Sequence, residues 1–401
     1  FQCIKPAAEQ RNFLQLAVEE CFKQSSGEGQ PMILGIDASI WMYQAERALN
    51  FKNTAAGPNP HLRILFYKLV ALLELPIRVV FVFDGVGRPD IKRGINVNTS
   101  GHRLTNSFCE LIRLFGYHSH TAPGEAEAEL ARMNLEGVLD AVETTDSDTL
   151  VFGASTVIII PQKKVDGKNI TLYTAENIFI TPGVSITRGG LLLIALLVGG
   201  DYNKARTSSQ CFDPEFTSTK QGIPGCGAVI AHAIACSNLG DSLLTETLLY
   251  PYVTDHLLTF LVAWRAALCL EFSTDPHGYL GRKHKAIAAA ITNTPSFPDI
   301  NVLFAYVHPT TSWSEGFTLP NHRLWGLAHP NTAGITVFCE NHFGWSTSDI
   351  AVKFRKLLYS GVAIQSLLKV CACFLIPTLA YPATFSLMIY MRYSKRTWSW
   401  A

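Results

Sequence analysis

The sequence is poor in charge and lacks the motifs of common small metal-binding domains. Asp, Glu, Lys and Arg make up 16% of its 401 residues, against about 25% in a typical soluble domain, and the formal net charge is +1. Because no overall field draws such a chain toward nucleic acid or anionic membranes, any binding of this kind has to come from local patches. The ten cysteines include no C-x-x-C pair, which argues against a zinc site and indicates reduced, mostly buried thiols of an intracellular protein.

Aspartates stand at the ends of three apolar runs of the sequence. The runs cover residues 31–36, 76–83 and 139–145, and their length and composition indicate buried strands. Segments with helical spacing separate them, so the pattern predicts an α/β fold with a mostly parallel sheet. Ligands of such sheets bind outside the carboxyl ends of the strands, so we expect the acids to gather at one edge. These acids are Asp37, Asp84, Asp146 and Asp148.

A second group of carboxylates lies in the stretch 124–129. Glu125 and Glu129 are four residues apart, so on a helix they share a face and repel one another by about 0.2–0.5 kcal/mol. Two explanations are open: acids are favourable in the first turn of a helix that begins near Pro123, or several oxygens hold a divalent cation. Together with Asp201 and the strand-end acids, the set would repel strongly unless two Mg²⁺ or Mn²⁺ ions neutralised it, an arrangement that suits phosphoryl transfer.

The sequence changes character after its midpoint. Residues 203–221 are polar and irregular, and a glycine-rich turn at 222–227 leads into helices expected at 228–236 and 243–270. Residues 297–309 are expected to be extended. The second half therefore predicts an α-helical unit that follows the α/β layers.

The end of the sequence carries an apolar segment at 370–391. It has no charged residue over 22 positions and is long enough to span a bilayer, with Arg392 on its flank as a membrane segment would have. Pro377 and Pro382 interrupt it, however, and a soluble amphipathic stretch precedes it, so we expect no membrane association. We recognise neither an N-terminal signal sequence nor an internal repeat.

Several spaced motifs resemble those of the XPG/flap-endonuclease family of structure-specific nucleases. In chain order they are GIDAS, FVFDG, APGEAEAE, TTDSDTLVFG, GGDY and GIPGCG, over residues 33–236, with a looser resemblance to about residue 358. The match looks closest to fungal members that resemble the eukaryotic Holliday-junction resolvase branch. The resemblance implies a PIN-like three-layer α/β/α core, a helix-hairpin-helix DNA-binding unit and a nuclear location. It also implies Mg²⁺-dependent hydrolysis of phosphodiesters in branched DNA, which leaves a 5′-phosphate and needs no small-molecule cofactor.

By this resemblance, seven acids fall on the positions of the family's metal ligands. They are Asp37, Asp84, Glu125, Glu127, Asp146, Asp148 and Asp201. Two of them, Glu125 and Asp146, also count as catalytic. Glu129 and Asp140 have no counterpart in the family, and we assign them helix-dipole and surface roles.

Other positions match the family's DNA-contacting residues. Tyr43 matches a tyrosine that stacks on a base near the scissile phosphate; the alternative is a core tyrosine on a helix face. Lys92, with Arg93 beside it, resembles the basic group that stabilises charge on the phosphate under attack; the alternative is a solvated loop lysine. The glycine-rich turn matches the helix-hairpin-helix turn, whose backbone N–H groups hold a duplex phosphate, in some members with a monovalent cation. Its glycines are Gly222, Gly225 and Gly227.

The sequence departs from the family pattern at three places. The family begins with Met-Gly and this sequence begins at Phe1, so the contact of that glycine near the active site is not carried over. Residues 203–221, either a loop insertion or translated non-coding sequence, separate the acids from the glycine-rich turn. Ala228 and Val229 follow the turn where many relatives have a basic residue, which predicts a weaker grip on DNA.

The resemblance divides the chain into four expected regions. They are a PIN-like core at 1–200, a helix-hairpin-helix region at 201–270 with its insertion at 203–221, a C-terminal part of the nuclease unit at 271–365, and an apolar tail at 366–401. The stretch between residues 93 and 116 is too short for the helical arch of true flap endonucleases, which favours a branch that accepts continuous junction strands.

These observations lead to one hypothesis and two alternatives. The hypothesis is a two-metal-ion endonuclease for branched DNA, a 5′ flap, fork or Holliday junction, which serves DNA repair and recombination as a monomer or a dimer on DNA. The first alternative is a catalytically impaired DNA-binding or scaffold protein of the same fold. The second is a membrane-anchored protein with a vestigial nuclease core.

Overall fold

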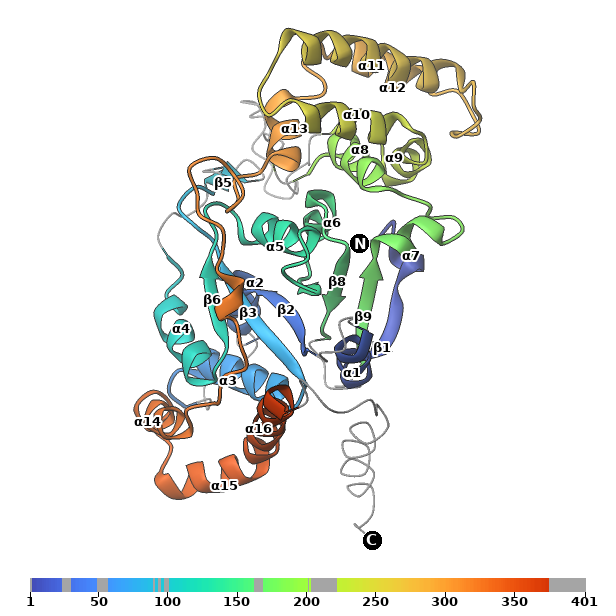
Figure 1. The fold of residues 1–401 in the computed structure, drawn as a ribbon. Helices are drawn as coiled ribbons and strands as arrows, with labels where there is room; N and C mark the ends of the chain where they lie inside the picture. The colour runs from blue at the N-terminus through green and yellow to red at the C-terminus, as the bar shows by residue number, and fades with distance from the viewer. Residues whose placement is uncertain are drawn as a thin grey trace.

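The computed structural model describes most of the chain. The residues described are 2–23, 30–48, 57–88, 91–92, 95–96, 101–161, 169–200, 202 and 222–374. Figure 1 shows a central sheet with helices on both faces, a group of helices beyond one end of the sheet and a second group beyond the other end.

Seven strands within the described residues form one mixed sheet in the order β1-β9-β8-β7-β2-β3-β6. Their bounds are β1 Glu9–Asn12, β2 Met32–Asp37, β3 Ile77–Phe83, β6 His118–Thr121, β7 Ala141–Glu143, β8 Thr156–Ile159 and β9 Asn169–Thr174. The five strands from β8 to β6 run parallel, and β9 and β1 continue the sheet in antiparallel pairing. A separate hairpin joins β4 (Ile91–Lys92) to β5 (Ile95–Asn96). The expected, mostly parallel α/β sheet is confirmed.

Helices cover both faces of the sheet. One face carries α1 (Phe13–Lys23), α2 (Ala38–Arg47), α3 (Pro60–Leu73) and α4 (Thr105–Leu114), and the other carries α5 (Ala126–Leu135), α6 (Asp148–Phe152) and α8 (Arg188–Val198). Alternate residues of β3 therefore enter different cores: Val79 and Phe81 pack with the first set of helices, and Val80 and Val82 with the second. Burial on both sides explains why β2 and β3 read as nearly continuous apolar runs.

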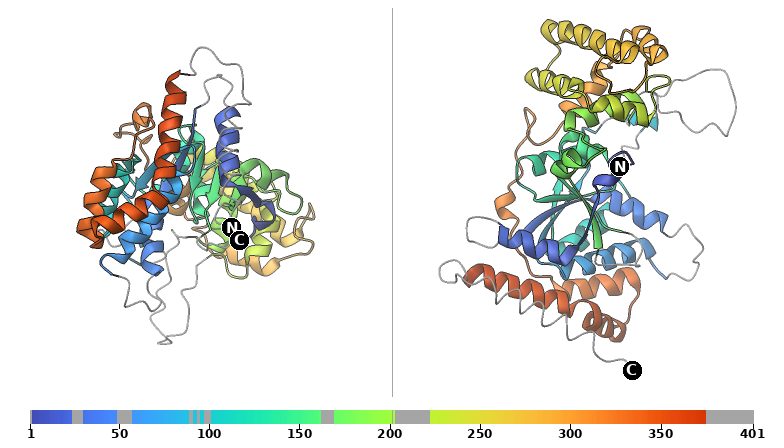
Figure 2. Two further views of the ribbon diagram at one scale, coloured as in Figure 1. Left: turned by 90° about the horizontal axis from the view of Figure 1, so that it is seen from below. Right: turned by 90° about the vertical axis from the view of Figure 1, so that its right-hand side faces the viewer.

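The remaining helices form two groups at opposite ends of the sheet (Figure 2). The first, called here the helical unit, contains α9 (Ala228–Ala235), α10 (Leu239–Leu249), α11 (Asp255–Thr274), α12 (Lys285–Thr292) and α13 (Ile300–Val307), and it packs on α8. The second contains α14 (Thr332–Phe343), α15 (Thr347–Leu357) and α16 (Tyr359–Phe374), where α14 contacts α4 and α16 contacts α3. The part of the chain that the structure describes also contains the short helices η1 (Lys5–Ala7), α7 (Ala175–Ile180) and η3 (His322–Leu324).

One expected element was wrong: residues 297–309 are not extended throughout but contain helix α13. Asp299 caps this helix by accepting from the Asn301 backbone N–H, at 2.9 Å. Its buried residues Val302, Leu303, Tyr306 and Val307 recur at helical spacing. The run of apolar, aromatic and β-branched residues is equally typical of a strand, so composition alone could not separate the two.

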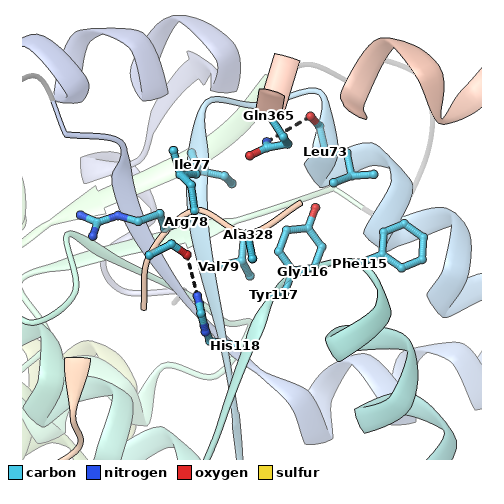
Figure 3. Close-up of a pocket in the computed structure, with 12 residues that line it drawn as sticks. Leu73, Ile77, Arg78, Val79, Phe115, Gly116, Tyr117, His118, Ala328 and Gln365 are labelled. Carbon is cyan, nitrogen blue, oxygen red and sulfur yellow. Dashed lines mark hydrogen bonds between the residues drawn. The ribbon is translucent and has the colours of Figure 1, made fainter. Parts of the chain in front are cut away.

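A small pocket lies between the first residues of β3 and β6 and the segment 326–328 (Figure 3). His118 Nε2 lies 2.8 Å from the Gly326 carbonyl oxygen, and the Gln365 amide donates to the Leu73 carbonyl at 3.3 Å. The pocket includes Ile77, the first residue of β3, and so lies at the opposite end of that strand from Asp84. The space it encloses is no larger than one water molecule needs, so it is not a substrate site.

One helix of the described chain, α11, is long and apolar enough to cross a membrane by length and composition. It lies in the helical unit, where a third of its most apolar window is buried. Leu257, Trp264 and Phe272 are among the helix residues that pack against neighbouring helices. The apolar segment noted at 370–391 lies outside the described residues except for its first five, which end α16.

Candidate metal centre

The carboxyl ends of β2 and β3 place two aspartates side by side. The strands are parallel with Asp37 opposite Val82, so Asp84 lies two residues beyond the position opposite Asp37. Asp37 also caps α2 by accepting from the Ile40 N–H at 3.1 Å, and it is only 3% exposed. Burial, followed by the charge of Asp84, raises the pKa of Asp37 to about 8. The two carboxylates are thus held in mutual repulsion at the edge where ligands of such sheets bind.

Asp84 connects the strand ends to the start of α5. Its Oδ1 accepts from the Ala126 N–H at 2.9 Å, in the first turn of α5, and its Oδ2 accepts from the Ser39 hydroxyl at 2.8 Å. Glu125 is the N-cap residue of α5 and is buried, and Glu127 follows half-buried in the first turn. The structure therefore joins the two groups of carboxylates that the sequence separates.

Asp146 and Asp148 reach the same edge from β7. That strand pairs in parallel with β2, Glu143 opposite Ile36, so the chain leaves β7 beside the end of β2. The Asp148 N–H donates to Asp146 Oδ1 at 3.0 Å and fixes the turn between them. Both side chains are half-buried. Six of the seven predicted ligands are thus placed on elements that end or begin at one edge of the sheet; the seventh, Asp201, lies outside the described residues.

The donor set suits a hard divalent cation. Within the described residues, no three His, Cys, Asp or Glu side chains already converge as a metal ion would require. The ligands are nevertheless all carboxylates, which Mg²⁺ and Mn²⁺ prefer. Burial and the charge of Asp84 raise the pKa of Asp37, and a bound cation would lower it again because it stabilises the charged carboxylate. The residues present therefore fit a divalent metal.

The surroundings of Tyr43 exclude the interpretation as a core tyrosine and leave its stacking on a base as a prediction. Its side chain is 55% exposed on α2, so it is not a core tyrosine. Its ring meets the His102 ring edge to face, with centroids 5.2 Å apart. Lys92 lies in the short hairpin of β4 and β5, and Arg93 lies outside the described residues. The roles of Tyr43, Lys92 and Arg93 stay predictions.

The glycine-rich turn leads into α9, and its Gly225 and Gly227 are exposed while Gly222 is half-buried. Buried Ile223 and Cys226 anchor the turn, and the Ile223 N–H donates to the Leu197 carbonyl of α8 at 2.8 Å. Gly225 has a φ of +82°, a conformation that other residues rarely adopt, and Gly227 is the N-cap residue of the helix. Gly222 lies so close to the end of α8 that a side chain would collide with the Leu197 carbonyl.

Glu129 lies in the first turn of α5, where its expected helix-dipole role places it, but the expected surface position was wrong for Glu129 and Asp140. Glu129 is fully buried, where Oε1 lies 2.9 Å from His120 Nε2 and Oε2 accepts from the Ser312 N–H at 2.8 Å. It therefore ties α5 to the segment after α13. Asp140 is half-buried and accepts from the Ile33 N–H at 2.6 Å. The sequence did contain a signal for the burial of Glu129. It lies four residues after Glu125, and this spacing puts both side chains on the same inward face of α5.

Three other groups near the edge were not predicted from the sequence. The hydroxyl of Tyr202 donates to Glu125 Oε2, and that of Tyr306 donates to Asp148 Oδ2 at 3.1 Å. Glu143 is buried, accepts from Trp41 Nε1 at 2.7 Å, and has its pKa raised to about 7 by burial. Its carboxylate adds to the charge that raises the pKa of Asp37.

Comparison with known proteins agrees with this geometry. A family model described as the XPG N-terminal domain matches residues 20–105, and one described as the XPG I-region matches residues 116–201. A solved structure of the eukaryotic junction-resolving enzyme GEN-1 binding with potassium is 30% identical, has a TM-score of 0.70, and covers 92% of this chain and 78% of that one. The chain belongs to the XPG/flap-endonuclease family. The I-region match ends at Asp201, three residues after the end of α8.

Two further XPG relatives show the extent of the similarity. Flap endonuclease GEN-like 1 of Arabidopsis thaliana is 31% identical over 197 residues, which are 42% of this chain and 31% of the relative. A structure of the Holliday junction-resolving enzyme GEN1 in complex with product DNA and a Mg²⁺ ion is 28% identical with a TM-score of 0.68, and covers 92% of this chain and 79% of that one. The chain spans between 17% and 66% of the length of the first curated relatives that it matches.

Proposed function

We propose that this XPG-family chain is a Mg²⁺-dependent endonuclease that hydrolyses phosphodiester bonds in branched DNA, at a 5′ flap, a fork or a four-way junction. The observation that carries the proposal is the hydrogen bond from the Ala126 N–H to Asp84 Oδ1. It brings the strand-end pair Asp37 and Asp84 against the helix that begins with Glu125 and Glu127. The nuclear setting of DNA repair and recombination follows from the same family membership.

Each part of the site has a proposed role. Mg²⁺, or Mn²⁺ in its place, would supply charge stabilisation for the attacking and leaving oxygens of a phosphodiester. The residues proposed to hold it are Asp37, Asp84, Glu125, Glu127, Asp146, Asp148 and Asp201. Exposed Tyr43 offers a ring face on which an unpaired base can stack, and Lys92 and Arg93 are proposed to steady the charge of the phosphate under attack.

The glycine-rich turn is proposed to bind the duplex arm of the substrate. Gly222, Gly225 and Gly227 are the proposed contacts. Gly225 and Gly227 are exposed where α9 begins, and backbone N–H groups at a helix start hold phosphates without reading sequence. A monovalent cation at this turn would add a further phosphate contact. In this proposal, phosphodiester hydrolysis occurs at the edge of the sheet and the duplex binds to the helical unit.

The test is cleavage of end-labelled flap, fork and four-way substrates with and without Mg²⁺. Asp146→Ala and Glu125→Ala are expected to reduce the rate at least about 100-fold while DNA binding is largely retained. Glu110→Ala is the matched control, since this exposed acid lies on α4, away from the strand ends. Undiminished Mg²⁺-dependent cleavage by both site variants would contradict the nuclease assignment. If the wild-type chain binds DNA but never cleaves it, the alternative of a catalytically impaired DNA-binding protein is favoured.

A further inference from the structure

Two tyrosines connect candidate metal ligands that stand on different helices. Tyr306 lies on α13 of the helical unit, is fully buried, and donates its hydroxyl to Asp148 Oδ2 at 3.1 Å. Tyr202 donates its hydroxyl to Glu125 Oε2. The two rings meet edge to face with centroids 4.8 Å apart. A path of contacts therefore runs from Glu125 at the start of α5, through both phenols, to Asp148 at the start of α6.

The surroundings hold both rings in place. Phe152, at the end of α6, packs against the Tyr306 ring at 5.7 Å and against the Tyr202 ring at 6.3 Å between centroids. Gly200 leaves the space that the Tyr306 hydroxyl occupies, because a Cβ at this position would collide with that oxygen. A side chain at position 200 would therefore force the buried Tyr306 ring, and with it the hydroxyl that donates to Asp148, to shift.

The chemistry of the two phenols suits them to hold carboxylates. A phenol is protonated at neutral pH, so each hydroxyl can donate to a carboxylate oxygen. A carboxylate has two oxygens and about four acceptor positions. A phenol that occupies one of them restricts the rotamer of the carboxylate and leaves its negative charge unchanged.

We propose that Tyr306 is a positioning residue for the divalent-cation ligand Asp148, and that Tyr202 acts in the same way on Glu125. The inference rests on the proposed metal-dependent function. Groups that orient metal ligands typically contribute about 10–100-fold to metal affinity. Because Tyr306 belongs to α13, the helical unit that binds duplex DNA also sets the cation affinity of the sheet edge.

The first experiment measures Mn²⁺ binding to the full chain by calorimetry, without DNA. Tyr306→Phe keeps the ring and removes the hydroxyl, and we expect its Mn²⁺ affinity to fall about 10-fold. Tyr117→Phe is the matched control, because it removes a tyrosine hydroxyl that donates to the Leu69 carbonyl at 3.1 Å, away from the acids. Both variants lose one hydrogen bond, so a merely structural role would lower their thermal stability similarly and leave the Mn²⁺ affinity of both unchanged.

A second variant disturbs the contact between Tyr306 and Asp148 by a substitution at Gly200. Gly200→Ala places a methyl group against the Tyr306 hydroxyl and should reproduce the loss of Mn²⁺ affinity. In the double variant Gly200→Ala/Tyr306→Phe the colliding oxygen is gone, so we expect an affinity no lower than that of Tyr306→Phe alone. If the double variant instead loses Mn²⁺ affinity by the product of the two single losses, the two substitutions act independently on the structure, and the proposal is overturned.

Cleavage kinetics supply the third readout. For Tyr306→Phe we expect the Mg²⁺ concentration for half-maximal cleavage to rise about 10-fold, with the rate at saturating Mg²⁺ close to that of the wild type. Wild-type Mn²⁺ affinity in both Tyr306→Phe and Gly200→Ala would overturn the positioning role and leave the nuclease assignment standing. A wild-type chain that neither binds Mn²⁺ nor cleaves would overturn both.

Discussion

The sheet core and the helical unit contribute to the candidate site with opposite kinds of groups. The core supplies charged carboxylates at the ends of β2, β3 and β7, where the sheet register fixes their positions. The helical unit supplies a neutral donor, the hydroxyl of Tyr306, and the glycine-rich turn before α9 is proposed to supply backbone N–H groups. A change in the core should therefore remove a ligand and abolish activity, whereas a change in the helical unit should shift an affinity.

The strongest test of this contrast is Asp84→Asn. The amide oxygen can still accept from the Ala126 N–H and keep α5 in place, but the side chain has lost the charge that a cation requires. We expect single-turnover cleavage to fall at least about 100-fold with an unchanged melting temperature or a higher one. A variant that cleaves at more than a tenth of the wild-type rate would show that Asp84 serves the fold and not the metal.

A second prediction concerns the contact that joins the two regions, Glu129. Glu129→Ala removes a buried acceptor from the Ser312 N–H and from His120, which should lower the free energy of unfolding by about 2–4 kcal/mol. Chemical denaturation measures this loss. Glu136→Ala is the control, because its ion pair with Arg132 is exposed and should contribute less than about 0.5 kcal/mol. Equal losses in both variants would contradict the role of Glu129 as a buried link.

The sequence predicted the residues of the sheet core better than those of the helical unit. The core acids were predictable because each follows a local pattern, an apolar run or a helix start, within a few residues. The contact between Tyr306 and Asp148 joins residues 158 positions apart, and no local pattern reports such a pairing. Helix α13 was misread because its apolar run fits strand and helix alike, and the burial of Glu129 depends on a segment that arrives only after α13.

The third prediction concerns the charge repulsion in the metal-free core. The pKa of Asp37 is raised from 3.8 to about 8, so the folded state holds a proton that the unfolded state releases, and stability present below pH 3.8 is lost as the pH rises through about 8. Asp37→Asn keeps the α2 cap and removes this loss. We expect the metal-free variant to exceed the wild type by about 1–3 kcal/mol at pH 8 and by less at pH 5.

Thermal unfolding at the two pH values, with and without Mg²⁺, checks this prediction. Mg²⁺ should stabilise the wild type more than the Asp37→Asn variant, because only the wild type has the repulsion for a cation to relieve. If the variant is less stable than the metal-free wild type at pH 8, Asp37 is held by its α2 cap contacts and does not carry an uncompensated charge.

The smallest expected effect lies in the helical unit and separates its two exposed glycines. Gly225 has a φ of +82°, so Gly225→Ala should strain the turn by about 1 kcal/mol and weaken duplex binding up to about fivefold. Gly227 has a φ of −80° and nothing within 4 Å of a Cβ, so Gly227→Ala should leave the turn unchanged. Fluorescence anisotropy at one fixed salt concentration measures both affinities. Because these groups are neutral, cleavage at saturating DNA should be nearly normal in both variants, and a lost cleavage rate in Gly225→Ala would mean that the helical unit does more than bind.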